Sequence, residues 1–431
     1  MSARGTWGHE VVYQVFPDRF HPWHPGQAAW PVPGSFAWNG HPVRHSRSAA
    51  AVTHRHRHQY TFLGGTLEGI RRRLDHVQQL GATALYLTPV FASCSTHRYD
   101  TDDYTRIDPV LGDRAAFERL RDDVHGRGLR LVLDGVFNHT SFHHPWVTAR
   151  PEFYLQAPGG GPETWMGTGL LPKLDPEHPE LQDALLAVLD HWGAVDAWRL
   201  DASHLIARSF LRRLKDHLAG RSLVIGEDWD DARFDLHEGL YDGVTNFAFK
   251  RNAEAFLNGD CSPETLARRL RVVYEGYPWE GVLRSWNLLG NHDTDRVFSK
   301  LGQREPHLQL ARVLQLFLPG TPLVYYGDEW GQTGWGDWGA RGPMVWRPSA
   351  AQRRRRDALA ELLAVRRAHP VLATGGLRFL HASNRDRVLV WERAGLDGRA
   401  VVGLNLGPRA VTWEGEGARL SLPSLGWDLW V

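Results

Sequence analysis

The chain has 431 residues, of which 42% are hydrophobic, so it is long enough to bury a large core. Its 50 Lys and Arg residues nearly balance 49 Asp and Glu residues. This balance argues against a nucleic acid or an anionic membrane surface held by bulk charge. The only cysteines, Cys94 and Cys261, cannot form a disulfide framework.

The first residues contain no targeting or membrane signal. Residues 1–15 lack a charged start followed by an apolar segment, so we predict no signal peptide, no membrane span and a cytoplasmic location. The 19 Trp residues are unusually many, and several stand in predicted loops, where they suit stacking on the apolar faces of sugars.

Apolar runs typical of buried strands alternate with stretches of helical periodicity. The helical stretches are residues 67–80, 117–124, 181–192, 211–218 and 313–317. The strand candidates are residues 11–16, 84–90, 129–136, 195–200, 223–226, 241–247, 282–289 and 321–326. Eight strands with helical spacers predict an α/β fold, the (β/α)8 TIM barrel.

Two insertions interrupt this alternation of strands and helices, and the alternation itself ends near residue 371. Residues 21–63 are rich in Pro, His and Trp, and residues 140–172 predict a short loop subdomain after the third strand. Short strands without helices follow at 388–392, 400–406, 411–414 and 427–431. We therefore expect a catalytic barrel over residues 1–370 and a small C-terminal antiparallel β domain over residues 371–431.

Three carboxylates stand at or just past the ends of predicted strands. They are Asp201 in the sequence WRLD, Glu227 in VIGE and Asp293 in NHD. Because the carboxyl ends of barrel strands share one rim, these side chains should converge on one pocket. Three such carboxylates with an Arg and two His nearby suit the cleavage of glycosidic bonds.

Cleavage with retention needs an ionised nucleophile and a protonated donor about 5–5.5 Å apart. Arg199 precedes Asp201 by two residues and shares its strand face, so we expect it to hold Asp201 as a carboxylate. Glu227 follows an apolar strand, a setting that raises a carboxyl pKa and suits a general acid. Asp293, beside His292, would bind sugar hydroxyls and favour an oxocarbenium-like ring.

These motifs resemble the α-amylase family of retaining α-glucan enzymes, most closely the neopullulanase, cyclomaltodextrinase and maltogenic amylase branch. The similar segments are GGTLEGI at 64–70, HRYDTDDY at 97–104, DGVFNH at 134–139, LPKLD at 171–175, AWRLD at 197–201, GE at 226–227 and LGNHD at 289–293. The resemblance implies that Asp201 is the nucleophile, Glu227 the acid/base and Asp293 the transition-state stabiliser.

The resemblance also implies binding roles for eight residues. Arg199 would fix Asp201, His139 and His292 would hydrogen-bond the sugar, Tyr99 would stack beneath its ring, and Asp134 would support the His139 loop. His204 and Trp229 are candidates for the leaving-group side, and Arg296 for the donor side or for a structural role.

The chain departs from the branch at two points. It offers no room for the extra N-terminal β domain, so we expect a monomer rather than a dimer that exchanges this domain. The loop after the first strand, DRFHPW from Asp18, is poor in hard oxygen ligands, so we predict no metal or other cofactor and no required calcium there. Asn138 leaves another calcium site open, whereas the alternating His54-Arg-His-Arg-His58 lacks a closed ligand set.

The expected activity is hydrolysis of α-1,4 links in maltooligosaccharides and related α-glucans through a covalent glucosyl-enzyme. The small Ala202 after Asp201 favours α-1,4 over α-1,6 links by the same resemblance. One alternative is a glucanotransferase or a trehalose-forming, isomerising enzyme that passes the same intermediate to a sugar. The other is an inactive sugar-binding scaffold, which would typically have lost one of the three carboxylates.

Overall fold

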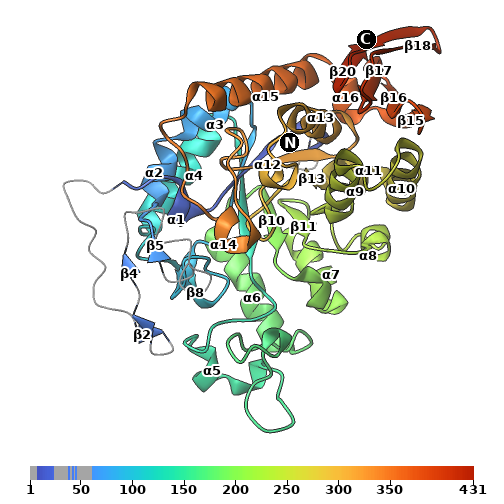
Figure 1. Ribbon diagram of the computed structural model, residues 1–431. Coiled ribbons are helices and arrows are strands. Elements are labelled where there is room, and N and C mark those ends of the chain that lie inside the picture. Colours follow the sequence, from blue (N-terminus) through green and yellow to red (C-terminus); the bar gives the residue numbers. More distant parts are fainter. Residues whose placement is uncertain (1–6, 24–36, 39–40, 43, 46–60) are drawn as a thin grey trace.

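The computed structural model describes residues 7–23, 37–38, 41–42, 44–45 and 61–431, so the His54–His58 motif lies outside the described residues. Eight parallel strands form one sheet in the order β12-β11-β10-β9-β6-β1-β14-β13. They are β1 Val12–Val15, β6 Ala84–Leu87, β9 Arg130–Gly135, β10 Ala197–Leu200, β11 Leu223–Gly226, β12 Gly243–Val244, β13 Trp286–Leu288 and β14 Thr321–Tyr325. A parallel bridge between Thr245 and Trp286 joins the outer strands. The predicted barrel is thereby confirmed (Figure 1).

Helices connect the strands and surround the barrel. The longer ones are α3 Leu74–Leu80, α4 Arg114–Gly126, α6 Pro179–Trp192, α7 Arg208–Leu218, α9 Phe247–Asn258, α10 Pro263–Gly276, α13 Glu305–Phe317 and α15 Ala350–Ala368. The shorter ones are α1 Pro17–Phe20, α2 Leu67–Arg71, α5 Trp146–Ala149, α8 Arg233–His237, α11 Trp279–Arg284, α12 Val297–Lys300, α14 Gly336–Ala340 and α16 Val371–Thr374. Among the described residues, none of these helices has the length and apolar character needed to cross a bilayer.

Three predicted boundaries differ from the structure. The helical stretch 67–80 is divided between α2 and α3, and it ends as predicted at Gly81, whose φ of 103° is left-handed. The sixth strand stops before residue 247, because the Asn246 side chain accepts a hydrogen bond from the Phe249 N–H and begins α9. The apolar run 282–289 starts within α11, since a short apolar run does not distinguish a strand from a buried helix.

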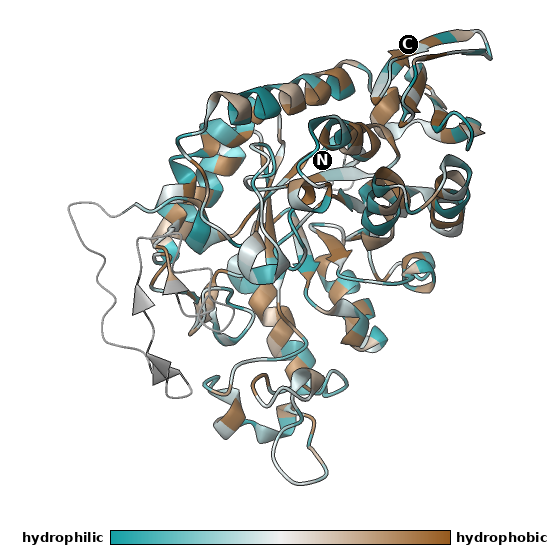
Figure 2. Ribbon diagram, in the orientation of Figure 1, coloured by the Kyte–Doolittle hydropathy of each residue, from teal (hydrophilic) through white to brown (hydrophobic). Residues whose placement is uncertain are grey.

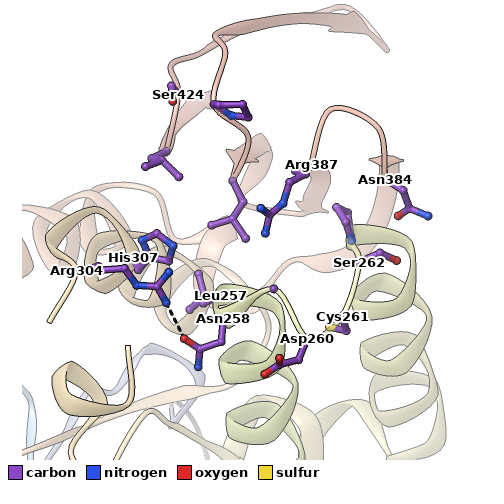
Figure 3. A pocket seen from close by; sticks show the side chains of 15 residues that line it. Leu257, Asn258, Asp260, Cys261, Ser262, Arg304, His307, Asn384, Arg387 and Ser424 are labelled. Carbon is purple, nitrogen blue, oxygen red and sulfur yellow. Dashed lines mark hydrogen bonds between the residues drawn. The ribbon is translucent and has the colours of Figure 1, made fainter. Parts of the chain in front are cut away.

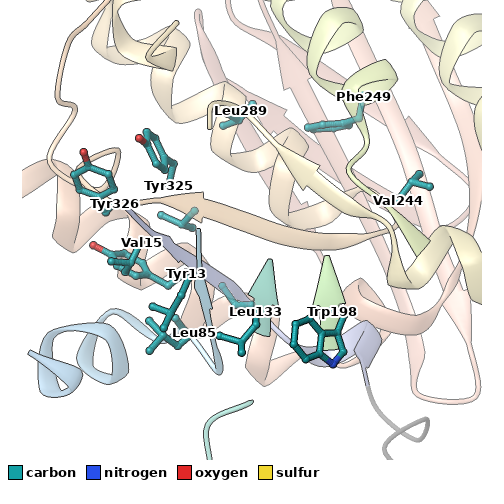
Figure 4. Close-up of a cluster of buried hydrophobic side chains, with 14 of the residues drawn as sticks. Tyr13, Val15, Leu85, Leu133, Trp198, Val244, Phe249, Leu289, Tyr325 and Tyr326 are labelled. Carbon is teal, nitrogen blue, oxygen red and sulfur yellow. The ribbon is translucent and has the colours of Figure 1, made fainter. Parts of the chain in front are cut away.

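The barrel interior is filled with side chains. Because successive strand residues point to opposite faces, Val12, Tyr86 and Ile225 belong to one buried cluster. Tyr13 and Trp198 belong to a larger one that includes the surrounding helices (Figure 4). Figure 2 accordingly shows hydrophobic and hydrophilic residues mixed along the helices around the barrel. The packed interior confines polar chemistry to the ends of the strands.

An antiparallel sheet follows the barrel, which confirms the C-terminal part of the predicted fold class. Its order is β15-β16-β17-β20. Its strands are β15 Gly376–Ser383, β16 Val388–Gly395, β17 Gly398–Asn405 and β20 Gly426–Trp430, and β18 Val411–Gly415 pairs with β19 Ala418–Leu422. Strands β15 and β19 were not predicted; β15 carries a register shift between Phe379 and His381 that breaks its alternation. A domain boundary near residue 370 stays a prediction.

The insertions add short strands and a loop. The described strands of the first are β2 Ala37–Trp38, β3 His41–Pro42, β4 Arg44–His45 and β5 Thr61–Phe62, and β7 Phe91–Ser93 pairs with β8 Thr101–Ile107. Residues 140–172 contain α5; a bridge from Thr164 to Pro172 lies within them, and one from Tyr154 to Leu174 joins them to the following segment. This loop lies between β9, the strand that carries Asp134, and α6.

Two buried arginines join the barrel to the sheet. Arg393 donates to the carbonyl oxygens of Leu372 at 2.7 Å, Gly375 at 2.7 Å and Phe317 at 2.9 Å. Arg366 also donates to Leu372, at 3.0 Å. Burial lowers the pKa of each guanidinium to about 9, and the charge of Arg366 contributes to the shift of Arg393. No carboxylate of the described residues pairs with either, so carbonyl dipoles alone compensate these charges.

Replacement of Arg393 by Met should destabilise the protein by about 3 kcal/mol, because several buried carbonyl oxygens lose their donor. Urea unfolding measures this change in the free energy of unfolding. Arg385→Met, at an exposed position, serves as the matched control and should change stability by less than about 0.5 kcal/mol. Equal stability of both variants would contradict the role given to Arg393.

Candidate active site

Adjacent strands bring four of the predicted side chains together at the carboxyl rim of the barrel. The register pairs Arg199 of β10 with Asp134 of β9 and with Ile225 of β11. Asp201 and Glu227 are the first residues after β10 and β11. Residues far apart in the sequence therefore meet around the Arg199 guanidinium.

The Arg199 guanidinium contacts three carboxylates. Its Nη1 lies 2.8 Å from Asp134 Oδ1 and 2.9 Å from Asp201 Oδ1, and its Nη2 lies 2.8 Å from Glu227 Oε1. Arg199 is 1% exposed, whereas the side chains of Asp201 and Glu227 are 13% and 8% exposed. One cation thus fixes both carboxyl groups of the predicted catalytic pair, and each keeps a small exposed area.

A strained turn at Ala202 provides a hydrogen bond to the second carboxylate oxygen of Glu227. Ala202 has φ 44° and ψ 40°, a left-handed conformation that costs about 1–2 kcal/mol for a residue other than Gly. In this conformation its N–H donates to Glu227 Oε2 at 2.8 Å. Gly226 is required before Glu227, because a Cβ there would lie 3.0 Å from both Ser203 Oγ and the Tyr241 ring. The turn therefore orients Glu227 relative to Asp201.

The electrostatics of Asp201 differ from the expectation that Arg199 keeps it ionised. Burial raises the pKa of Asp201 well above its ordinary value; Arg199 opposes this rise, and the charges of Glu227, Asp134 and Asp293 add to it. The prediction was wrong because burial outweighs the attraction of Arg199, whose positive charge also serves Asp134 and Glu227. Burial thus favours the protonated form of Asp201 while the cleft holds no sugar.

Asp293 lies in a second group of charges on the same rim. Its Oδ2 is 2.9 Å from His292 Nε2, and its Oδ1 accepts a hydrogen bond from Arg341 Nη2 at 3.0 Å. Burial opposes its ionisation, but the interactions with His292, Arg341 and Arg199 outweigh burial and hold the pKa of Asp293 far below its usual range. With its side chain 28% exposed, Asp293 presents a permanent negative charge to the cleft.

Tyr99 connects the two groups. Its hydroxyl donates to Asp134 Oδ2 at 2.8 Å and lies 2.5 Å from His292 Nε2, and its ring is within 5° of parallel to the His292 ring. Tyr86 donates to the same Asp134 oxygen at 2.7 Å. Gln14 Nε2 lies 2.9 Å from His292 Nδ1, which leaves the proton of this ring on Nε2. Both carboxylate oxygens of Asp134 therefore accept hydrogen bonds, one from Arg199 and the other from Tyr99 and Tyr86.

His139 is buried beside this network. Its Nε2 lies 3.0 Å from the Tyr99 carbonyl oxygen, and Asn138 Nδ2 lies 3.1 Å from its Nδ1. Burial lowers the pKa of His139 to about 4, so the ring is neutral at pH 7. The ring centroid is 5.8 Å from that of Trp165, in the loop after β9.

The candidate calcium ligands are engaged by other groups. Asn138 faces His139 as described, and the Asp18 carboxylate pairs with Arg19 and accepts hydrogen bonds from the N–H groups of Leu63 and Gly64. In the part of the chain that the structure describes, no group of three or more His, Cys, Asp or Glu side chains is placed to hold a metal ion.

The remaining predicted binding residues differ in their exposure. Trp229 is 38% exposed and stacks on Phe247 with 3.7 Å between ring centroids, and His204 is exposed as well. Arg296, in contrast, is completely buried; it donates to the Tyr326 carbonyl oxygen and to Asp328. The structure therefore makes Trp229 and His204 accessible and places Arg296 as a structural support between the loops after β13 and β14.

Sequence reasoning missed three residues of this site: Arg341, Tyr86 and Gln14. Arg341 Nε also donates to the His292 carbonyl oxygen at 2.9 Å, so this arginine fixes both the backbone and the carboxylate of the β13 loop. It lies far along the chain, in the loop after β14, without a strand pattern to place it. The inward-facing polar side chains of β1 and β6 were the one available signal, since Gln14 and Tyr86 stand within otherwise apolar strands.

Comparisons with known proteins agree with this geometry. The family model described as alpha amylase, catalytic domain, matches residues 14–156 and 165–367. Neopullulanase 2 of Thermoactinomyces vulgaris is 33% identical over 99% of this chain and 73% of its own length. A cyclomaltodextrinase of Geobacillus thermopakistaniensis is 32% identical over 91% of this chain and 67% of its own length.

Solved structures with the same fold include the cyclic α-maltosyl-(1→6)-maltose hydrolase of Arthrobacter globiformis, with a TM-score of 0.85, 29% identity and 98% coverage of both chains. A debranching enzyme of Nostoc punctiforme has a TM-score of 0.80 and 26% identity, again with 98% coverage of both chains. The rim carboxylates, the barrel that holds them and these similarities lead to one conclusion: the chain belongs to the α-amylase family.

Proposed function

We propose that the protein hydrolyses α-1,4 links in maltooligosaccharides and related α-glucans with retention of configuration. The observation that carries the proposal is the single Arg199 guanidinium that holds Asp201 and Glu227 side by side at the barrel rim. Retaining glycosidases need such a pair, with one carboxyl group as the nucleophile and the other as the proton donor. The similarity to a neopullulanase and a cyclomaltodextrinase supports the substrate class.

The positions of the two carboxyl groups support a double displacement. In the empty cleft, burial favours the protonated form of Asp201. A bound sugar whose anomeric carbon gains positive charge favours the ionised form of Asp201, which the nucleophile requires. Glu227 then protonates the glycosidic oxygen while Asp201 forms the bond to the anomeric carbon. Water, activated by the Glu227 carboxylate, hydrolyses the intermediate.

The surrounding residues would bind the sugar and stabilise the transition state. Asp293, whose pKa is far below its usual range, would contribute a fixed negative charge toward the oxocarbenium-like ring. His292 would hydrogen-bond a sugar hydroxyl, and Tyr99 would stack beneath the ring. The single N–H of the neutral His139 faces the Tyr99 carbonyl oxygen, so His139 would have to give up that bond to donate to a sugar. Trp229, exposed and supported by Phe247, would bind the leaving-group side, with His204 as a further contact.

The finer properties of the enzyme stay predictions of the sequence. The preference for α-1,4 links rests on the small Ala202, and the choice of water over a sugar acceptor depends on acceptor-site affinity. A cytoplasmic location and a monomeric state are likewise predicted, as is the absence of a required cofactor. Light scattering after size exclusion tests the monomer.

Asp201→Asn should lower kcat about 10⁴-fold or more for every substrate, because the variant lacks the nucleophile. Glu227→Gln should lower kcat about 10²–10⁴-fold for maltotriose and much less for an aryl α-maltoside whose leaving group needs no proton. Steady-state kinetics on both substrates measures the difference. Asp122→Asn, at a carboxylate whose side chain is 66% exposed, is the matched control; equal losses for Glu227→Gln on the two substrates would contradict the acid role.

Fresh products should carry the α configuration, because two displacements at the anomeric carbon restore its stereochemistry. Proton NMR during the first minutes of maltotriose cleavage shows which anomer forms first. Chromatography of products from maltotriose, cyclodextrin, pullulan, isomaltose and sucrose, repeated at high sugar concentration, separates hydrolysis from transfer. Initial β product would exclude retention, and products longer than the substrate would show that transfer to a sugar dominates.

Asp134→Asn should shift the alkaline limb of kcat/KM to lower pH by about one unit. The charge of Asp134 contributes to the raised pKa of Asp201, so its removal lets the catalytic pair lose its proton more easily. The pH profile is compared with that of Asp122→Asn. An unchanged limb, or a shift to higher pH, would contradict the influence of Asp134 on the ionisation of Asp201.

A further inference from the structure

A pocket of about 780 Å³ lies between the barrel and the C-terminal sheet. It is formed by the turn between α9 and α10, by the start of α13 and by loops that follow β15 and β17 (Figure 3). No residue of the proposed active site lines it. Its volume is typical of sites for small organic ligands.

Three nitrogen-bearing side chains converge on this pocket. Figure 3 shows Arg304 and His307 at one side and Arg387 at another. Arg304 donates through Nη2 to Asn258 Oδ1 at 2.7 Å and through Nε to the Leu301 carbonyl oxygen at 2.8 Å. These two bonds hold the guanidinium at the pocket wall and leave its Nη1 open.

Arg387 extends from the sheet toward the barrel. A Cβ at Gly259, on the opposite wall, would lie 3.4 Å from Arg387 Nη2. No carboxylate of the described residues pairs with Arg387, which is exposed. Its backbone φ of 57° is left-handed. The turn therefore brings a cation without a protein partner to the pocket, at the expense of backbone strain.

His307 is buried close to the positive charges of Arg304 and Arg387. The residue is 8% exposed, and its Nδ1 is buried without a hydrogen-bond partner. Burial lowers its pKa, and the charges of Arg304 and Arg387 lower it further. Among the described residues of the lining, Asp260 is the one acidic residue, and no ion pair joins it to these three side chains.

The other side chains of the lining indicate whether a neutral sugar or a phosphorylated one fits the pocket better. The amide and hydroxyl groups of Asn258, Asn384, Ser262 and Ser424 each make a hydrogen bond within the protein, and their remaining donor and acceptor capacity can serve a polyhydroxylated molecule. Among the described residues, no Trp, Tyr or Phe lines the pocket, so a neutral sugar would find no ring to stack on. Two arginines suit a phosphate group, which accepts charge-assisted hydrogen bonds from guanidinium groups.

We propose that this pocket binds a small sugar phosphate, with the phosphate group between Arg304, His307 and Arg387 and the sugar hydroxyls toward the amide and hydroxyl side chains. The site is separate from the proposed active site, so its occupation does not depend on the catalytic assignment. A bare phosphate ion would fill only part of the volume.

Calorimetric titration of the full chain with glucose 6-phosphate tests the proposal, with inorganic phosphate and glucose as the comparison probes. Glucose 6-phosphate should bind more tightly than either. Arg387→Gln should weaken its binding about tenfold or more and leave the hydrolysis of maltotriose unchanged. Arg304→Gln should weaken it as well. Arg385→Gln, at a neighbouring exposed arginine outside the lining, is the matched control and should bind as the wild type does.

Two results would overturn the proposal. Equal affinity for inorganic phosphate and glucose 6-phosphate would exclude the sugar contacts. Binding that Arg387→Gln leaves unchanged, or that Arg385→Gln weakens to the same extent, would exclude this pocket as the site. The thermal unfolding midpoint of each variant verifies that the protein is folded in every titration.

Discussion

The burial of one guanidinium determines the geometry of the rim. Arg199 is almost inaccessible, and a single buried cation would be costly without partners. It is compensated by Asp134, Asp201 and Glu227, each within 2.9 Å. Three carboxylates around one cation leave an excess of negative charge, which adds to burial in raising the pKa of Asp201. The same interaction thus fixes the positions of the two catalytic carboxyl groups.

The other half of the rim is built on a second arginine. Arg341 comes from the loop after the last barrel strand and binds both the His292 carbonyl oxygen and the Asp293 carboxylate. The two halves meet at Tyr99, whose hydroxyl lies between Asp134 and His292. Asp293, whose pKa is held far below its usual range, therefore adds a permanent negative charge to the rim that carries Asp201 and Glu227. A sugar that develops positive charge at this rim is stabilised by it.

Much of this arrangement could be predicted from the sequence, because local spacing encodes it. Eight apolar runs gave the barrel, and the two-residue spacing of Arg199 and Asp201 predicted their contact. The partnership of Arg199 with Glu227 depends on the register between β10 and β11, which no local pattern encodes. The pKa of Asp201 was predicted in the wrong direction because its burial, the largest cause of the rise, and the nearby Glu227 are both set by the folded rim. Arg341 escaped prediction for a related reason, since an irregular loop brings it to the rim. Strand β15 was missed because a register shift breaks its alternation.

The two buried arginines between the barrel and the sheet are compensated differently from the arginines of the rim. Arg366 and Arg393 have no carboxylate partner among the described residues, yet carbonyl oxygens surround both, and Leu372 accepts from each. Fixed carbonyl dipoles thus compensate most of each buried guanidinium, although Arg366 Nε has no acceptor. Arg387, in the turn before β16, differs from both because it is exposed and has neither carboxylate nor carbonyl partner among the described residues. A guanidinium that no protein acceptor holds at a pocket wall can bind an anion from solution without breaking an existing contact.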